Sequence, residues 1–124
     1  MSEENLHAEL TQRIIGIAME VHRELRNGLD EKLYENAMCI DFADQNIFFD
    51  QQKRYTVFYK KRPIGNLIPD LIIDNSVIVD AKVVESFNDA HLSQMIGYLK
   101  ITGLRVGLLL NFKHASLKIK RITI

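Results

Sequence analysis

Two aspartates and a lysine in the middle of the chain have the types and spacing needed for metal-assisted chemistry. Asp70 follows Pro69, and Asp80 and Lys82 lie further along, in the run VIVDAK. Residues 74–76 (Asp-Asn-Ser) are turn formers, so the segments on either side are predicted to pair as a β-hairpin. With these three residues as the loop, Asp70 faces Asp80 across the hairpin. Lys82 shares a face with Asp80, because side chains alternate along a strand.

The surroundings of these residues suggest what they do. Both faces of the hairpin are otherwise mostly apolar, as in central strands that are covered on both sides. Ionisable groups there are costly unless they are paired or bind a cation, and like charges placed opposite one another repel. A hard divalent ion turns that repulsion into attraction, and carboxylate oxygens suit Mg²⁺, which also binds phosphate. A nearby lysine can activate a water or offset charge on phosphorus, so the set suits phosphodiester hydrolysis.

A plainer interpretation of the same three residues stays open. In it, Asp70 only forms a turn after Pro69, and Asp80 and Lys82 form an ordinary ion pair on a half-exposed sheet. A shift of one residue in the register would also move Asp70 to the other face of the hairpin.

The rest of the chain supplies the elements that must position these residues. Apolar spacings of three and four predict helices, and alternation predicts strands. Asn88 is a predicted N-cap, and Gly103 is a predicted helix stop. The predicted order is α-α-β-β-β-α-β-β, with helices over 5–26, 30–46 and 89–102 and strands over 52–60, 64–73, 77–84, 105–111 and 117–124. This order predicts an α/β fold with a central mixed β-sheet flanked by helices.

Length and composition set the class of protein. The 124 residues fit one domain, 1–124, large enough to bury a core without disulfides. No apolar run approaches the length of about 20 residues that a membrane helix needs. The first ten residues lack the basic and apolar regions of a signal peptide, and Cys39 is the only cysteine. We therefore expect a cytoplasmic protein without a membrane partner.

The charges are unevenly distributed although the net charge is zero. Residues 1–50 hold 11 Asp/Glu and 4 Lys/Arg, whereas the charged residues of 51–62 and 100–124 are all Lys or Arg. One face could therefore bind a polyanion. The alternative is a set of solvated strand edges guarded by lysines.

Four short motifs occur along the chain in the order helix, hairpin, helix, strand pair. They are GLDEKLY (28–34), PD followed by DAK (69–82), QMIGY (94–98), and GLRVGLLLNF with LKIKRI (103–122). The hairpin motif resembles the one that names the PD-(D/E)xK nuclease superfamily, and QMIGY resembles the QxxxY motif of its exonuclease branch. GLDEKLY is similar to the GxxExxY motif of a small bacterial family in that superfamily, and the closing strands also resemble that family.

The resemblance implies a restriction-endonuclease-like core and a deoxyribonuclease dependent on Mg²⁺ or Mn²⁺. Asp70 and Asp80 would ligate the metal, the carbonyl of Ala81 would be a further ligand, and Lys82 would be the catalytic lysine. The chain departs from the family's common form in having Asp80 where glutamate is usual and Pro69 where a small residue is usual. Neither change removes a ligand, although both bear on the geometry that Mg²⁺ demands.

The resemblance also assigns residues on two helices. Glu31 would be the acidic residue that the first core helix adds to the site as a metal ligand. Glu35 lies one turn later on the same face and is its rival. Gln94 would point into the site, and Tyr98 shares its helix face.

Two functions are therefore carried forward, and RNA or a nucleotide stays open as a different substrate for the first. The first is a metal-dependent nuclease that hydrolyses DNA. The second is a non-catalytic module of the same fold that binds nucleic acid or a protein partner, because fold alone does not establish activity. The zero net charge argues against tight DNA binding by a lone monomer, so a homo-oligomer or a protein partner would help.

Overall fold

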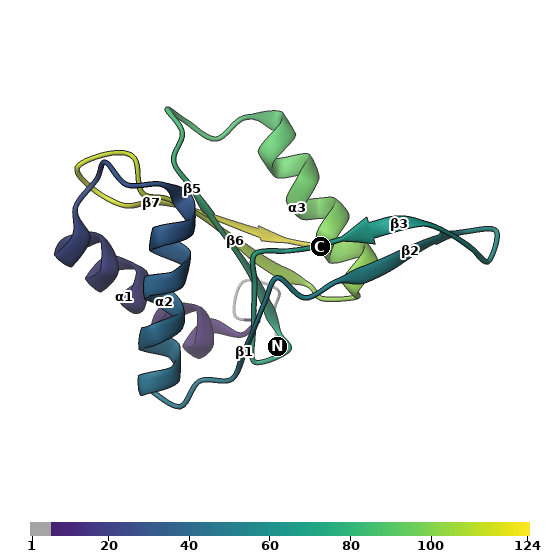
Figure 1. The fold of residues 1–124 in the computed structure, drawn as a ribbon, viewed down its shortest axis with the longest axis horizontal. Helices are drawn as coiled ribbons and strands as arrows, with labels where there is room; N and C mark the ends of the chain where they lie inside the picture. The colour runs from purple at the N-terminus through teal and green to yellow at the C-terminus, as the bar shows by residue number, and fades with distance from the viewer. Residues whose placement is uncertain (1–5) are drawn as a thin grey trace.

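A five-stranded mixed sheet lies at the centre of the computed structural model, which describes residues 6–124 (Figure 1). The elements are α1 (Ala8–Leu25), α2 (Glu31–Asp44), β1 (Phe49–Gln51), β2 (Tyr55–Tyr59), β3 (Arg62–Leu67), β4 (Leu71–Ile73), β5 (Val77–Lys82), α3 (Asp89–Thr102), β6 (Val106–Asn111) and β7 (Lys118–Thr123). The expected mixed α/β fold is confirmed. Asn5, where the first helix was predicted to start, lies outside the described residues. No described helix is both long and apolar enough to cross a membrane.

The strands of the sheet are ordered β1-β4-β5-β6-β7. β5 and β6 are parallel and are joined through α3, whereas the other neighbours are antiparallel. β6 is an inner strand and is buried at every position, as its apolar run predicts. The β4–β5 hairpin pairs Ile73 with Val77 and Leu71 with Val79, which is the predicted register.

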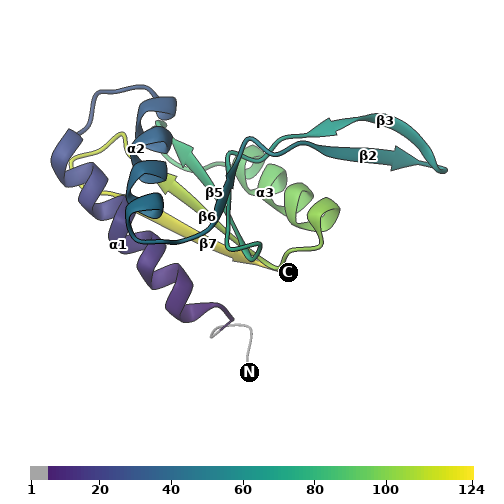
Figure 2. The ribbon, with the colours of Figure 1, turned by 60° about the horizontal axis from the view of Figure 1, so that its bottom comes forward.

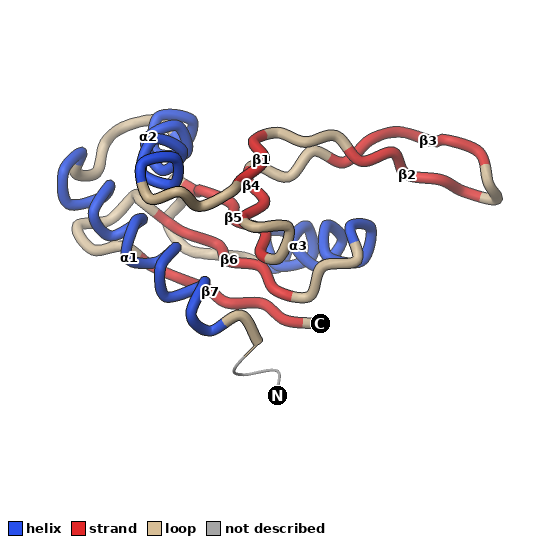
Figure 3. The backbone as a smooth tube through the Cα atoms, turned by 90° about the horizontal axis from the view of Figure 1, so that it is seen from below, coloured by secondary structure: helices blue, strands red, loops and turns tan. Residues whose placement is uncertain are grey.

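Helices cover both faces of the sheet and give it two apolar layers (Figures 1 and 3). α1 and α2 pack on one face, against alternate residues of the hairpin such as Leu71 and Val79. α3 packs on the other face, where Met95 and Leu99 meet Ile72. Val79 and Ala81 belong to the layer that α1 and α2 cover. Because side chains alternate along a strand, the side chain of Asp80 between them lies on the α3 side of β5.

The segment between β1 and β4 differs from the prediction. Residues 52–60 and 64–73 were expected to be two strands of the central sheet. Instead, β2 and β3 pair only with each other and form a separate hairpin that extends away from the sheet (Figure 2). The short β1 was missed, because three residues give too little alternation to recognise.

Pro69 explains why the predicted strand over 64–73 is broken. Proline has no backbone N–H and cannot donate to a β ladder. β3 ends at Leu67, and the chain rejoins the sheet only at Leu71. Asp70 therefore lies at a bend just before β4, in partial agreement with the plainer interpretation of this residue.

Both ends of α3 are fixed by local chemistry. The Asn88 side chain accepts from the His91 N–H (3.0 Å), and His91 Nδ1 accepts from the Asn88 N–H (3.1 Å). Gly103 ends the helix at φ 79°, as predicted. Gly107 lets α3 approach β6 closely, because a Cβ there would overlap with the Met95 thioether. These contacts place the Gln94 helix firmly against the sheet.

Tyr34 fixes the start of α2. Its hydroxyl donates to the carbonyl of Arg26 (2.6 Å) and accepts from the Leu29 N–H (3.1 Å). Its ring stacks on Phe112 with centroids 4.4 Å apart, and both rings are fully buried. The first turns of α2, which carry Glu31 and Glu35, are thereby held against the sheet.

Candidate active site

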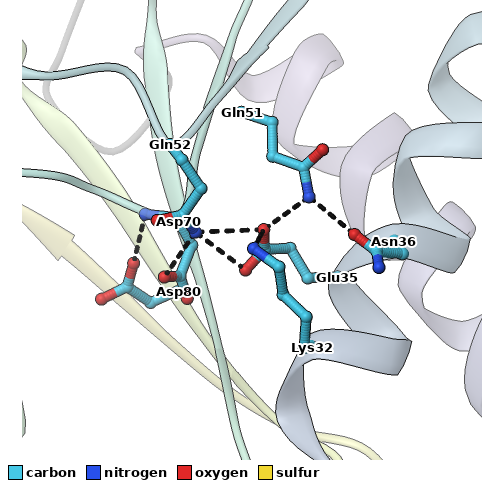
Figure 4. A network of polar contacts seen from close by, with 7 residues as sticks. All are labelled: Lys32, Glu35, Asn36, Gln51, Gln52, Asp70 and Asp80. Atoms are coloured by element: carbon cyan, nitrogen blue, oxygen red, sulfur yellow. Dashed lines mark hydrogen bonds and ion pairs between the residues drawn. The ribbon is translucent and has the colours of Figure 1, made fainter.

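Asp70 and Asp80 meet at the open end of the β4–β5 hairpin. The backbone N–H of Asp70 makes a long hydrogen bond to Asp80 Oδ1 (3.4 Å), as Figure 4 shows. Asp80 is almost completely buried, with 2% of its surface exposed. Asp70 is half-buried beside it, and two neighbouring carboxylates in such surroundings repel each other unless a proton or a cation intervenes.

Burial is the main cause of the raised pKa values of both aspartates. Burial, together with the negative charges of Asp80 and Glu35, raises the pKa of Asp70 to about 7. Burial also raises the pKa of Asp80, against the opposing effects of Lys82 and of the Asp70 N–H. Strongly perturbed carboxyl groups are typical of functional sites, although ion-pair networks also produce them.

Lys82 and Gln94 lie beside the carboxylates. Lys82 Nζ is 4.0 Å from Asp80 Oδ2 and donates to Gln94 Oε1 (3.2 Å). Tyr98 lies one turn beyond Gln94 on α3, and its pKa is raised to about 12 by burial and by the charges of Asp80 and Asp70. The predicted lysine and the predicted glutamine are therefore brought together with the two aspartates.

Glu35 approaches the site through two glutamines (Figure 4). It is 3% exposed and accepts from Gln51 Nε2 (2.7 Å), from Gln52 Nε2 (3.1 Å) and from Lys32 Nζ (3.0 Å). Gln52 Nε2 also lies 3.4 Å from Asp70 Oδ1, and the Gln52 N–H donates to the Asp70 carbonyl (2.9 Å). The Gln52 side chain thus links Glu35 of α2 with Asp70, which is a predicted metal ligand.

Glu31 takes a different position. Its Oε1 accepts from the backbone N–H of Val83 (3.0 Å), the residue directly after Lys82. Its charge contributes to the raised pKa of Asp80, but less than that of Glu35. The Ala81 side chain is buried in the α1–α2 layer, on the face opposite to Asp80. The role predicted for its carbonyl stays a prediction.

The donor set fits a hard divalent cation that completes its shell with water. Within residues 6–124, no three or more His, Cys, Asp or Glu side chains are arranged to hold a metal on their own. Mg²⁺, however, is commonly bound through one or two carboxylates with several waters and substrate phosphates. Asp70 and Asp80 supply two such carboxylates, and their mutual repulsion would be relieved by the ion.

Gln51 and Gln52 are site residues that sequence reasoning missed. They belong to no recognised motif, and their contacts with Glu35 and Asp70 join segments 16 to 18 residues apart in the chain. Gln52 has a positive φ of 57°, which is uncommon for a residue other than glycine. Nothing in the local sequence marks that conformation.

Comparisons with known proteins agree with this fold. A family model described as the PD-(D/E)XK nuclease superfamily matches residues 8–122. No curated protein matches the chain. Among solved structures, the chain is similar to the crystal structure of SSO0001, with a TM-score of 0.51 and 12% identity. The match covers 89% of this chain and 65% of that one, and at such low identity it concerns the fold alone.

Proposed function

Because the chain belongs to the PD-(D/E)XK nuclease superfamily, we propose that it hydrolyses DNA phosphodiester bonds with Mg²⁺ or Mn²⁺ held by Asp70 and Asp80. The observation that carries the proposal is the pair of the buried Asp80 and the half-buried Asp70, with Lys82 beside it. The Asp70 backbone nitrogen lies 3.4 Å from Asp80 Oδ1, and Lys82 Nζ lies 4.0 Å from Asp80 Oδ2. A purely structural ion pair would need only one carboxylate for one lysine.

The metal would supply Lewis-acid stabilisation of the scissile phosphate and a more acidic water. Asp70 and Asp80 would hold the cation, because their carboxylates supply the negative charge that attracts it. Lys82 places a positive charge where charge develops on the phosphate or where a water loses its proton. Gln94 accepts from Lys82 and thereby keeps the ammonium group directed toward the site.

Membership of the GxxExxY family is a finer part of the proposal. It is supported by the way in which the three defining positions of that motif are used in this chain. Glu31 binds the backbone at the end of β5, and Tyr34 fixes the start of α2. Gly28, with φ 114°, occupies a backbone conformation that other residues rarely adopt.

Cleavage assays test the proposed reaction. Wild type is expected to cut plasmid or single-stranded DNA in Mn²⁺ or Mg²⁺ and to stop in EDTA. Asp80→Asn is expected to lower the rate by at least about 100-fold, because a ligand is removed from a site that has few. Equal cleavage by wild type and Asp80→Asn would mean that the activity arises elsewhere or from a contaminant. If wild type neither binds metal nor cuts, the non-catalytic module replaces the nuclease.

A pair of glutamine substitutions on α2 separates the two candidate acids. We expect Glu35→Gln to lower Mn²⁺ affinity by about 10- to 100-fold, because Glu35 adds negative charge next to both aspartates. Glu31→Gln is the matched control, since its amide oxygen can still accept from the Val83 N–H. Its expected effect is below about 3-fold, because a charge that acts on only one of the aspartates attracts the cation less. The opposite ranking in a calorimetric Mn²⁺ titration would assign the helix acid to Glu31.

A further inference from the structure

The hairpin of β2 and β3 carries a concentration of positive charge. We define the basic arm as residues 53–68, which contain five Lys/Arg and no Asp/Glu. The five are Lys53, Arg54, Lys60, Lys61 and Arg62. In the described part of the chain, none of them forms an ion pair with a carboxylate. The whole arm therefore presents uncompensated positive charge to a polyanion.

Exposed aromatic rings accompany these charges. Phe58 is 62% exposed and Tyr59 is 61% exposed, near the tip of an arm that extends from the sheet (Figure 2). The Lys60 ammonium lies 5.4 Å from the centre of the Tyr59 ring. Aromatic rings interleaved with cations are the recognition chemistry of single-stranded nucleic acids, whose unpaired bases stack on the rings.

The turn at the tip has a backbone conformation that lysine rarely adopts. Tyr59 pairs with Arg62, which leaves Lys60 and Lys61 as the two central residues of the turn. Both have positive φ values, 48° and 65°, where Asn-Gly is the preferred pair. Two lysines at these positions cost stability and place two charges at the outermost point. Backbone strain of this kind is often retained for function.

The arm begins and ends at the candidate active site. Gln52 immediately precedes it, and Asp70 follows it after Pro69. These two residues are joined by the Gln52 N–H···O=C Asp70 hydrogen bond (2.9 Å). At its base, Tyr55 packs beside α3, the helix that carries Gln94. A nucleic-acid strand bound along the arm would therefore extend to the carboxylates of Asp70 and Asp80.

We propose that the basic arm binds single-stranded DNA by phosphate contacts and base stacking and delivers the strand to Asp70 and Asp80. The choice of DNA rests on the proposed function, whereas the binding itself does not require cleavage. The lysines at the tip contact phosphates, and Phe58 and Tyr59 stack on unpaired bases. Duplex DNA offers the same phosphates but no free base faces, so it binds more weakly.

The first test changes the charge of the tip without endangering the fold. Lys60→Asn with Lys61→Gly introduces the preferred turn residues, so thermal stability is expected to be equal to or higher than that of wild type. Binding of fluorescein-labelled oligo(dT) in metal-free buffer is expected to weaken by at least about 10-fold at 0.1 M salt. The plot of log affinity against log salt is expected to become shallower by about 0.7 for each phosphate that the tip no longer neutralises.

The second test separates stacking from general apolar contact. Phe58→Ala is expected to weaken oligo(dT) binding by roughly 5- to 150-fold. Ile64→Ala is the matched control, because Ile64 is equally exposed (65%) on the same arm but has no ring. A similar weakening by both substitutions, or equal affinity for duplex and single strand, would overturn the stacking assignment.

Failure of the arm and failure of the nuclease are distinguishable. If wild type cuts DNA while the arm variants bind and cut equally well, the arm proposal is wrong and the nuclease stands. If wild type binds oligo(dT) through the arm but never cuts, the arm proposal stands and the nuclease is wrong. If wild type does not bind oligo(dT) even at about 0.05 M salt, where phosphate contacts are strongest, the arm serves another partner and the proposal is overturned.

Discussion

Replacing Lys82 by methionine is expected to lower the rate of DNA cleavage by about 10²- to 10⁴-fold, the usual contribution of a positioned acid–base or charge-stabilising group. Metal affinity should be unchanged or higher, because the ammonium group 4.0 Å from Asp80 Oδ2 competes with the cation. Single-turnover cleavage at saturating Mn²⁺ measures the first quantity, and calorimetry measures the second.

Lys82→Arg tells which role the lysine has. Arginine keeps the positive charge but stays protonated at all accessible pH values, so it cannot accept a proton from water. Partial activity in Lys82→Arg would point to charge stabilisation, and inactivity of both variants would point to proton transfer. A Lys82→Met variant with wild-type rates would remove Lys82 from the site altogether.

The second large effect is expected in the stability of the metal-free protein. The pKa of Asp70 is raised from 3.8 to about 7 by burial and by Asp80 and Glu35, so the folded protein holds this proton more tightly than the unfolded chain. The resulting stability is complete below about pH 4 and is lost as the pH rises through about 7. The metal-free protein should therefore melt at a lower temperature at pH 8 than at pH 5.

Asp70→Asn should remove much of that pH dependence. Asparagine cannot ionise, so in EDTA at pH 8 the variant is expected to melt about 5 °C above wild type, with a smaller difference at pH 5. Saturating Mn²⁺ should raise the melting temperature of wild type, because an ion that binds only the folded state stabilises that state. It should leave Asp70→Asn largely unaffected, because this variant lacks one of the two proposed metal ligands. Equal or lower melting temperatures for Asp70→Asn at both pH values would contradict a destabilising carboxylate pair.

The parts of the fold that the sequence predicted are those governed by local chemistry. The Asn88 cap and the Gly103 stop place α3 at the expected residues. The turn at residues 74–76 fixes the register of β4 and β5, and therefore brings Asp70 next to Asp80. Lys82 follows from strand alternation, since it lies two residues beyond Asp80 on the same face.

The parts that were missed depend on contacts between distant segments. Residues 52–60 and 64–73 alternate like strands of the main sheet, but only the tertiary structure shows that β2 and β3 pair with each other as a separate arm, while residues 71–73 join the main sheet as β4. Gln51 and Gln52 reach Glu35 from β1 and the bend after it, and no local pattern predicts that meeting. Periodicity marks a residue as strand-forming without telling which strand becomes its partner.

The tertiary structure also changed the balance between the two acids of α2. Both glutamates lie on one helix face, so spacing alone left Glu31 and Glu35 as rivals. The structure ties Glu31 to the Val83 N–H and Glu35 to Gln52, the residue that reaches Asp70. Glu35 is therefore the better supported candidate, and the paired glutamine substitutions test that ranking.

The most direct test of the proposed metal centre is a calorimetric titration of Mn²⁺ into wild type and Asp80→Asn, with DNA cleavage followed in the same samples. We expect wild type to bind the ion and cut DNA, and Asp80→Asn to do neither. Mn²⁺ binding of equal affinity in both proteins, or no binding by wild type at about millimolar concentration, where even weak carboxylate sites fill, would contradict a metal site built on Asp70 and Asp80.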